Sequence, residues 1–237
     1  MLNFTGKNIL IVGASSGIGE ELANLLIASG ANVYSVSRKN PNIAGVVHET
    51  LDVTNFDKTA LNQLPDTLHG LAYCPGSITL KPFVRLKEDD FLSDFEINVL
   101  GAVRVIQAVL PKLKKAKGSQ VVLFSTVATA VGMNFHASIA AAKGAVEGLA
   151  KSLAAEFAIN KITVNAIAPS LTDTPLAASL LATDERRANS AKRHPLGRVG
   201  VAHDVASLAA YLLSGSAGWI SGQTIGVDGG MSTIRNL

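Results

Sequence analysis

Residues 9–19 read Ile9-Leu10-Ile11-Val12-Gly13-Ala14-Ser15-Ser16-Gly17-Ile18-Gly19. The four apolar residues at the start are typical of a short strand that is buried on both faces. Gly13, Gly17 and Gly19 then permit a sharp turn and a close approach of the backbone to a pyrophosphate. A helix that begins near Ile18 presents free N–H groups and a positive dipole end to the same phosphates. This order of strand, glycine-rich turn and helix predicts a dinucleotide-binding unit.

Strand-like and helix-like segments alternate along the rest of the chain. Further strands are predicted at residues 32–37, 46–47, 71–74, 121–124, 162–167 and 224–227, and helices at 18–29, 56–61, 86–110, 137–157 and 204–213. The alternation predicts an α/β fold, a doubly wound (Rossmann) parallel sheet in a three-layer αβα arrangement. We expect a single domain over residues 1–237, with its ligand crevice at the carboxyl ends of the strands. An irregular stretch, residues 170–201, is typical of a lid or binding loop.

The composition excludes several classes of protein. The chain has 237 residues, of which 48% are hydrophobic and 16% charged, and a formal net charge of +3. This charge is too small to predict nucleic-acid binding, and no apolar run approaches the roughly 20 residues that a membrane span needs. The single cysteine, Cys74, excludes a disulfide framework and a Cys-rich zinc site, so no metal is expected. The N-terminus has no secretory signal pattern, and we expect a cytoplasmic protein.

The end of the second predicted strand indicates which dinucleotide binds. A site that selects NAD places an acidic residue about 20 residues after the glycines, where it binds the ribose 2′-hydroxyl. Here no Asp or Glu occurs between Glu21 and Glu49, and the strand ends in Ser37-Arg38-Lys39. A 2′-phosphate would meet a hydroxyl and two cations at this position. We therefore expect NADP(H), with Arg38 as the main discriminator and Ser37 assisting.

The glycine loop also fits a second motif. Its residues 13–17 match the G-x-S-x-G elbow of serine hydrolases, with Ser15 as the nucleophile, and Asp173 and His194 follow in the right order. However, only twelve residues precede the loop, which leaves no earlier strand and loop to build an oxyanion hole. The hydrolase is therefore the weaker interpretation.

Several further motifs of the sequence, besides the glycine loop, are typical of one family of dinucleotide-binding proteins. The segments concerned are Leu51-Asp52-Val53, Asn98, Lys143, Ala168-Pro169-Ser170, Thr174, Ser221-Gly222-Gln223 and Val227-Asp228-Gly229-Gly230. With them the sequence resembles the short-chain dehydrogenase/reductase family over essentially its whole length, close to the 3-oxoacyl carrier-protein reductases. In that resemblance Asn98 and Lys143 correspond to two members of the catalytic tetrad. Residues 168–170 correspond to the turn under the nicotinamide.

The resemblance implies a set of ligands and partners. It implies a cofactor site made of Gly13, Ser15, Ser16, Gly17, Ile18, Gly19, Ser37, Arg38, Asp52, Val53, Gly76, Lys143, Pro169, Thr172 and Thr174. It also implies a small-molecule substrate, with neither nucleic acid nor membrane as partner. Because family members commonly form tetramers through the helix that carries Lys143, we expect a homo-oligomer, a tetramer or dimer. Small residues in that helix are compatible with close subunit contact and equally with packing on the sheet.

The sequence departs from the family pattern at two catalytic positions. Counting back from Lys143, the active-site Tyr falls on Ile139 and the active-site Ser on Thr126, whose neighbour is Ser125. In the family, hydride passes to a carbonyl carbon while the Tyr protonates the oxygen, and isoleucine has no proton to donate. Loss of a positioned general acid typically costs roughly 10²- to 10⁴-fold in rate.

His136 is the strongest substitute for the missing acid. It lies seven residues before Lys143, a spacing that resembles the Tyr-x6-Lys pair of enoyl-thioester reductases, and histidine titrates near neutral pH. The alternative, a loop or helix-start residue without a catalytic role, stays open. We expect Tyr73 to form an aromatic wall near the nicotinamide, and Ser138 to point away from the site. The expected catalytic residues are Asn98, Thr126, His136 and Lys143.

These observations predict an NADP(H)-dependent oxidoreductase of the short-chain family. It would transfer a hydride to a carbonyl or an activated double bond and use a non-standard proton donor. The alternative is a catalytically weak or silent NADP(H)-binding member that acts as a sensor or partner subunit. The two hypotheses differ in whether any acid reaches the nicotinamide. We expect the segment 171–197, which mixes apolar and basic side chains, to cover the substrate.

Overall fold

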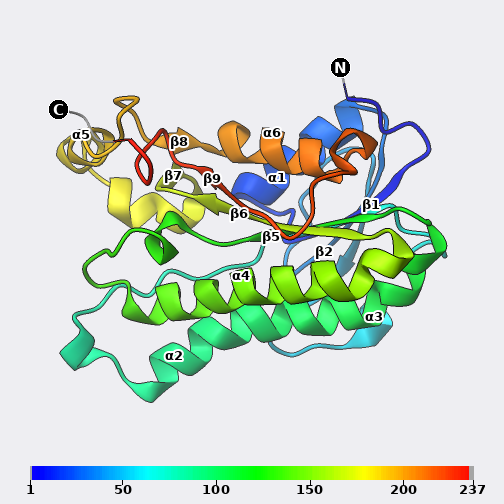
Figure 1. Cartoon of the computed structure of the whole chain (residues 1–237), viewed down its shortest axis with the longest axis horizontal. Helices are drawn as coiled ribbons and strands as arrows, with labels where there is room; N and C mark the ends of the chain where they lie inside the picture. Colours follow the sequence, from blue (N-terminus) through cyan, green and yellow to red (C-terminus); the bar gives the residue numbers. More distant parts are fainter. Residues whose placement is uncertain (1, 235–237) are drawn as a thin grey trace.

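The core of the molecule is a parallel sheet with the strand order β3-β2-β1-β4-β5-β6-β9 (Figure 1). We describe it from a computed structural model, which covers residues 2–234; residue 1 and residues 235–237 of the expected domain lie outside the described part. The strands are β1 (Asn8–Val12), β2 (Asn32–Ser37), β3 (Val46–Thr50), β4 (Gly70–Tyr73), β5 (Gln120–Phe124), β6 (Thr163–Pro169) and β9 (Thr224–Val227). All six pairings in this sheet are parallel, which confirms the predicted sheet type.

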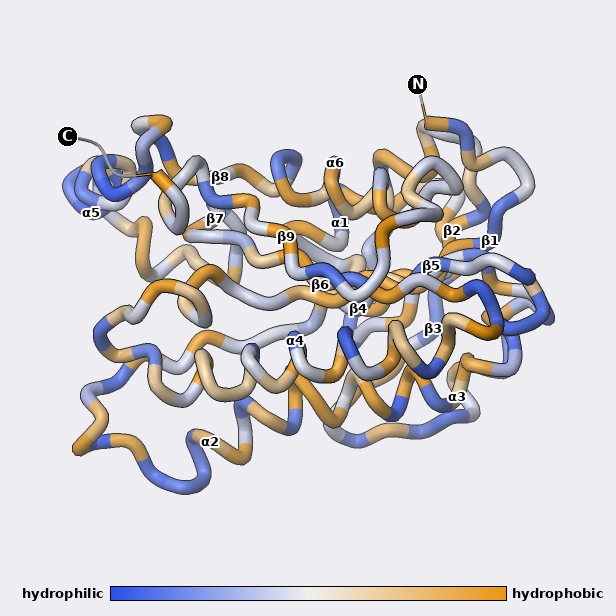
Figure 2. The backbone as a smooth tube through the Cα atoms, in the orientation of Figure 1, coloured by the Kyte–Doolittle hydropathy of each residue, from blue (hydrophilic) through white to orange (hydrophobic). Residues whose placement is uncertain are grey.

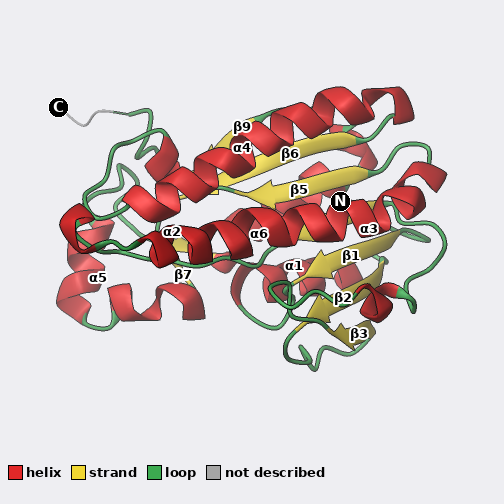
Figure 3. Cartoon of the chain, turned by 90° about the horizontal axis from the view of Figure 1, so that it is seen from below, coloured by secondary structure: helices red, strands yellow, loops and turns green. Residues whose placement is uncertain are grey.

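Helices cover both faces of the sheet (Figure 3). Helices α1 (Gly17–Ala28) and α6 (Ala202–Leu213) pack together on one face. The other face carries α2 (Glu88–Phe95), α3 (Gly101–Lys115) and α4 (Ala137–Phe157). The predicted three-layer αβα arrangement is therefore confirmed. Among the described residues, no helix combines the length and apolar character that crossing a bilayer requires.

Side-chain alternation along each strand divides the core between these two layers. In β1, Ile9 and Ile11 pack with α1 and α6, whereas Leu10 and Val12 pack with α3. Because both faces are covered, the central strands β1, β4 and β5 are mostly apolar along their length (Figure 2). The polar residues of the glycine loop therefore begin only where β1 ends, at the carboxyl edge of the sheet.

The predicted helix at residues 86–110 is present, but it is not an α-helix throughout. It consists of α2, a π-helical segment Glu96–Leu100, and α3, which continues through Pro111 to Lys115. The hydroxyl of Tyr73 donates a 2.6 Å hydrogen bond to the carbonyl of Ile97 within the π-helical segment. Such segments interrupt the regular helical ladder, often at functional sites. The predicted helix at 56–61 is only a 3₁₀ turn, Lys58–Leu61.

Residues 170–201 are more regular than the sequence indicates. They contain the paired strands β7 (Thr172–Asp173) and β8 (Gly200–Val201), a 3₁₀ helix Pro175–Leu181, and α5 (Asp184–Ala191). The segment lies at the end of the sheet toward which the strands point (Figure 3). Other short 3₁₀ turns are Phe83–Arg85, Val127–Thr129, Ala158–Asn160 and Gly215–Ala217.

Candidate active site

Two adjoining cavities lie at the carboxyl edge of the sheet. The first, about 390 Å³, is here called the glycine-loop cavity; the second, about 300 Å³, the Lys143 cavity. The first is lined by residues 12–13, 15–19, 36–38, 51–54, 74–76, 97 and 174–176. The second is lined by residues 18, 74, 76–78, 80, 124–127, 133, 136, 139, 143, 169–172, 174, 176–177, 180, 190, 193–194 and 231. Both include Ile18, Cys74, Gly76, Thr174 and Leu176, so they form one continuous crevice.

The glycine loop leaves no room for side chains at its turn. Gly13 and Gly17 have φ angles of +82° and +59°, a region that favours glycine. A Cβ at Gly19 would lie 2.2 Å from the carbonyl oxygen of Gly13, so only glycine lets α1 start this close to the strand. Ser15, Ser16 and Ile18 line the same cavity. The loop therefore offers backbone and hydroxyl groups at the N-terminus of α1.

The far end of the glycine-loop cavity contains the predicted discriminators between NAD and NADP. Ser37 and Arg38 line it at the end of β2, opposite Asp52 and Val53. The hydroxyl of Ser37 donates a 2.8 Å hydrogen bond to the carbonyl of Lys39. Arg38 is exposed and, within residues 2–234, its side chain forms no hydrogen bond or salt bridge. The amide and hydroxyl of Thr54 donate to Asp52 and lower the pKa of its carboxyl, and the charge of Arg38 contributes.

Lys143 and Asn98 meet beside Gly76. The Lys143 ammonium is buried and donates a 2.7 Å hydrogen bond to the carbonyl of Phe124; burial lowers its pKa to about 8. The amide nitrogen of Asn98 donates to Ser77 and to the carbonyl of Asp94. Its buried Oδ1 has no partner among the described residues. A Cβ at Gly76 would lie 3.2 Å from this oxygen and 3.5 Å from Lys143 Nζ, so a hydroxyl group fits there with both partners.

Ile139, which stands where the family has its tyrosine, faces the Lys143 cavity but has no acidic proton to donate. Ile139 lines that cavity together with Thr126, His136 and Lys143. Thr126 Oγ1 accepts a hydrogen bond from the amide of Ala128, so its hydroxyl hydrogen stays available. Ser125, the neighbouring residue, instead donates to the carboxylate of Glu147 at 2.5 Å.

His136 is the residue before α4, not part of the helix itself. Its Nδ1 lies 2.7 Å from the carbonyl of Asn134. Because a carbonyl oxygen only accepts, Nδ1 must carry the hydrogen, and Nε2 is left to bind a second proton or a ligand. Ser138 is turned away from the cavity, as expected, and donates to buried Asp94. Asn98 also lies outside the lining of both cavities, with its Oδ1 next to Gly76.

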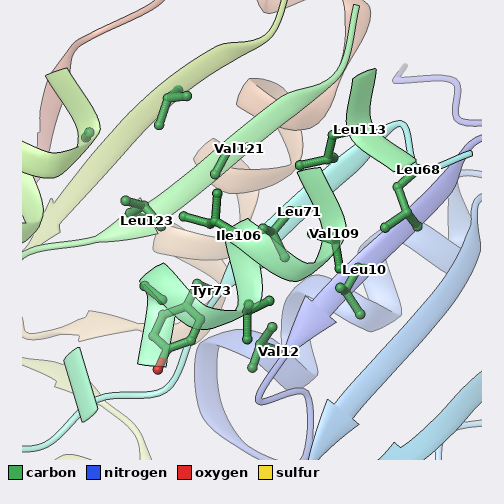
Figure 4. Close-up of a cluster of buried hydrophobic side chains, with 14 of the residues drawn as sticks. Leu10, Val12, Leu68, Leu71, Tyr73, Ile106, Val109, Leu113, Val121 and Leu123 are labelled. Carbon is green, nitrogen blue, oxygen red and sulfur yellow. The ribbon is translucent and has the colours of Figure 1, made fainter. Parts of the chain in front are cut away.

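The prediction that Tyr73 walls the nicotinamide is wrong. Leu71 and Tyr73 point to the same side of β4, so the ring of Tyr73 packs in the core under α3 (Figure 4). Its hydroxyl is engaged by Ile97, and burial raises the pKa of Tyr73 well above its ordinary value. Cys74, one residue on, lines both cavities, and burial raises the pKa of its thiol to about 12.

The hydrolase triad is not assembled. Ser15 lines the glycine-loop cavity, and Asp173 forms a 2.5 Å salt bridge with Arg187. His194 is buried at the wall of the Lys143 cavity, where its Nε2 lies 2.9 Å from the hydroxyl of Ser170. From the sequence, Ser170 was identified only as the last residue of the turn that corresponds to the turn under the nicotinamide. No sequence spacing indicated its partner, because the contact joins the end of β6 to the residues after α5.

Comparison with known proteins identifies the family. The family model described as Enoyl-(Acyl carrier protein) reductase matches residues 13–232. A 3-oxoacyl-[acyl-carrier-protein] reductase of Salmonella typhimurium is 31% identical over 246 residues, covering 98% of this chain and all of the relative. A tropinone reductase homolog of Arabidopsis thaliana is 31% identical over 244 residues, covering 96% and 93%. The chain belongs to the short-chain dehydrogenase/reductase family, as the sequence motifs indicated.

Solved structures agree with this assignment. A short-chain type dehydrogenase/reductase from Mycobacterium ulcerans superimposes with a TM-score of 0.91 at 29% identity, over 99% of this chain and 93% of that chain. An aldohexose dehydrogenase from Thermoplasma acidophilum gives 0.91 at 26% identity, over 98% and 96%. The family consists of oxidoreductases that use a nicotinamide dinucleotide. The glycine loop and the space beside Gly76 fit such a group.

Proposed function

We propose that this protein is an NADP(H)-dependent oxidoreductase that transfers a hydride to a carbonyl or an activated double bond without a tyrosine acid. The observation that supports it best is the continuity of the glycine-loop cavity with the cavity that holds Lys143. The two join at Cys74 and Gly76, so a ligand bound by the glycine loop can extend to Lys143. When bound, NADPH supplies the hydride.

Each part of the crevice has a proposed role in holding the dinucleotide. The glycine loop and the start of α1 bind its pyrophosphate, and Asp52 and Val53 border the adenine. Arg38 binds the 2′-phosphate, because a guanidinium forms strong charge-assisted bonds with phosphate oxygens. Ser37 assists when its hydroxyl turns from the carbonyl of Lys39 to the phosphate. Lys143 donates to ribose hydroxyls, with Asn98 behind them. The nicotinamide end is bordered by Pro169, Thr172 and Thr174.

The residues around Ile139 are proposed to act on the substrate. The hydroxyl of Thr126, and Nε2 of His136 once it carries a second proton, can donate hydrogen bonds to an oxygen that gains charge. Apolar side chains form much of the remaining wall and exclude water: Ile78, Leu80, Met133, Leu176 and Leu180. Exclusion of water strengthens those hydrogen bonds.

The experiment that tests the proposal begins with binding. NADPH affinity is measured by calorimetry, and ketones, enones and enoyl thioesters are then screened for NADPH oxidation. Turnover that is abolished in His136→Ala supports an oxidoreductase in which this histidine contacts the substrate. Tight NADPH binding without turnover, with new ketone reduction in Ile139→Tyr, supports the alternative, a silent dinucleotide-binding protein. Failure to bind NADPH contradicts both.

We also propose a homo-oligomer, a tetramer or dimer, that forms through α4. Ala141, Gly144 and Gly148 are exposed on one side of this helix, and a Cβ at either glycine would meet nothing within 4 Å. This face therefore has room for the backbone of a partner subunit. Gly148→Arg is expected to lower the mass measured by sedimentation; an unchanged mass contradicts this interface. The cytoplasmic location stays a prediction.

A further inference from the structure

Ser170 and His194 separate the Lys143 cavity from a third cavity. Both residues line the Lys143 cavity, and both also line a space of about 410 Å³ on their other side. We call this space the Asp228 cavity, after one of its two carboxylates; it is lined by residues 170, 194, 196, 198, 200, 204–205 and 226–230. The two side chains therefore form a polar partition between the candidate active site and a second region.

The hydrogen-bond directions in this partition are defined. His194 Nδ1 lies 2.9 Å from the carbonyl of Ser190, at the end of α5, so Nδ1 must carry a hydrogen. In the neutral ring, Nε2 then accepts the hydrogen of the Ser170 hydroxyl at 2.9 Å. When His194 is protonated, Nε2 donates to Ser170, and the hydroxyl hydrogen of Ser170 is released toward the cavity. The same pair can therefore hold a proton and pass it on.

The Asp228 cavity supplies negative charge beside the pair. Asp204 bonds Arg198 at 2.6 and 2.9 Å, and this contact lowers the pKa of the carboxyl to about 2. Burial alone would raise the pKa of Asp228. Hydrogen bonds from Ser232 and Gly230 outweigh burial, and the charge of His194 contributes, so the pKa lies below its ordinary value. Besides these two carboxylates, the charged side chains that line the two cavities on either side of His194 are Lys143, Arg193 and Arg198.

Ser170 lies near Thr126, one of the residues expected to contact the substrate. It follows Pro169, the last residue of β6, whereas Thr126 follows β5, the neighbouring strand. Neighbouring strands lie roughly 5 Å apart, so both hydroxyls reach the same small cavity. His194, by contrast, is buried behind Ser170 and 3% exposed.

We propose that Ser170 and His194 form a proton relay that replaces the missing tyrosine, delivering to the substrate the proton held on Nε2 of His194. The inference rests on the proposed function. After hydride adds to carbon, the π electron pair moves to the substrate oxygen, which takes the hydroxyl proton of Ser170. Ser170 takes the Nε2 proton of His194, and the ring becomes neutral. After the product leaves, Ser170 takes a proton from water in the Lys143 cavity and passes its own to Nε2 of His194, which restores the imidazolium. Thr126 and His136 hold the oxygen during this transfer.

Variants of the two residues test the relay by turnover. Ser170→Ala is expected to lower the rate of NADPH oxidation by about 10²-fold or more, while NADPH affinity is kept. Ser170→Thr, which retains a hydroxyl, should restore much of the rate. In His194→Gln the pH dependence of kcat and its solvent isotope effect should be lost. His203→Gln is the matched control, because His203 is exposed, bonds Glu21 and lines none of the three cavities. A Ser170→Ala enzyme with an unchanged rate and pH profile overturns the relay.

A second measurement does not depend on turnover. In the full chain labelled with ¹⁵N-histidine, His194 is expected to show a hydrogen on Nδ1 and, in the imidazolium, a second hydrogen on Nε2 that bonds Ser170. Ser170→Ala should shift the Nε2 resonance of His194 and leave that of His203 unchanged. A His194 that never takes a second proton overturns the relay even in an active enzyme. If His194 takes a second proton but the protein never oxidises NADPH, the result supports proton exchange between His194 and Ser170. The same result contradicts the proposed function.

Discussion

The hydroxyl of Ser138 donates a 2.6 Å hydrogen bond to Oδ2 of Asp94, across the contact between α4 and α2. Ser138 precedes Ile139, so this bond fixes the start of α4 beside the residue that replaces tyrosine. Asp94 also accepts the hydroxyls of Ser77, at 2.5 Å, and Thr79, at 3.0 Å. Its side chain is fully buried, and among the described residues no cation lies within salt-bridge distance. Hydrogen bonds from three hydroxyls therefore replace the hydrogen bonds with water that the Asp94 carboxylate loses on burial.

Asp94→Asn is expected to destabilise the protein. The amide nitrogen cannot accept a hydrogen bond, so at least one of the three hydroxyls loses its acceptor in a buried place. We expect the free energy of unfolding to fall by about 1–3 kcal/mol, measured by urea denaturation. Asp89→Asn, on the exposed side of the same helix, is the control and should leave stability unchanged. Equal stability of the two variants would show that the buried network contributes nothing.

Arg38→Ala is expected to weaken binding of NADPH selectively. Loss of charge-assisted bonds to the 2′-phosphate costs about 1.5–3 kcal/mol, which corresponds to a roughly 10- to 100-fold rise in Kd. NADH lacks that phosphate, so its Kd should not change. Calorimetry with both dinucleotides measures the difference, and Arg85→Ala, an exposed arginine outside the cavities, is the control. If NADH binds the wild type as tightly as NADPH, the assignment to NADP is wrong.

Gly76→Ala is expected to weaken binding of the dinucleotide without unfolding the protein. The new Cβ would occupy the space between Asn98 Oδ1 and Lys143 Nζ, at 3.2 and 3.5 Å, where a hydroxyl is proposed to bind. Gly132→Ala is the matched control, because a Cβ there meets nothing within 4 Å. The Kd for NADPH should rise in the first variant only. Identical Kd values would exclude this space as part of the binding site.

Lys143 is expected to give stability a defined dependence on pH. Its pKa is about 8 in the folded chain, lowered by burial, and its ordinary value is 10.5. Between these pH values the unfolded chain binds a proton that the folded chain does not, so the free energy of unfolding rises with pH. Below pH 8 both states are protonated, and burial of the charge costs stability. Urea denaturation without dinucleotide should show this rise in the wild type and not in Lys143→Met; parallel profiles would contradict it.

The sequence predicted the sheet because its central strands are local apolar runs. The strand that begins at Val46 was predicted too short, since β3 continues to Thr50 through His48 and Glu49 at the sheet edge. The glycine loop and the end of β2 were also recognisable, because each is a continuous motif. The alternation of side chains along a strand would have placed Tyr73 correctly, because Tyr73 lies on the same face of β4 as Leu71, which packs against α3.

The relationships that sequence alone did not reveal join distant segments. Ser170 and His194 are 24 residues apart, and Ser138 and Asp94 are 44 apart. Neither separation reflects a helical or strand period; both contacts are set by how α5 and α2 pack against the sheet and α4. Sequence patterns report local periodicity, so tertiary pairs of this kind become visible only in the folded chain.

The central claim is that this crevice binds NADPH and supports hydride transfer although Ile139 replaces the tyrosine. Its most direct test is the oxidation of NADPH by the purified protein, followed at 340 nm, across ketones, enones and enoyl thioesters. We predict tight NADPH binding and turnover with at least one of these classes in the wild type, before any tyrosine is introduced. Binding without turnover, or turnover that appears only in Ile139→Tyr, would contradict the claim.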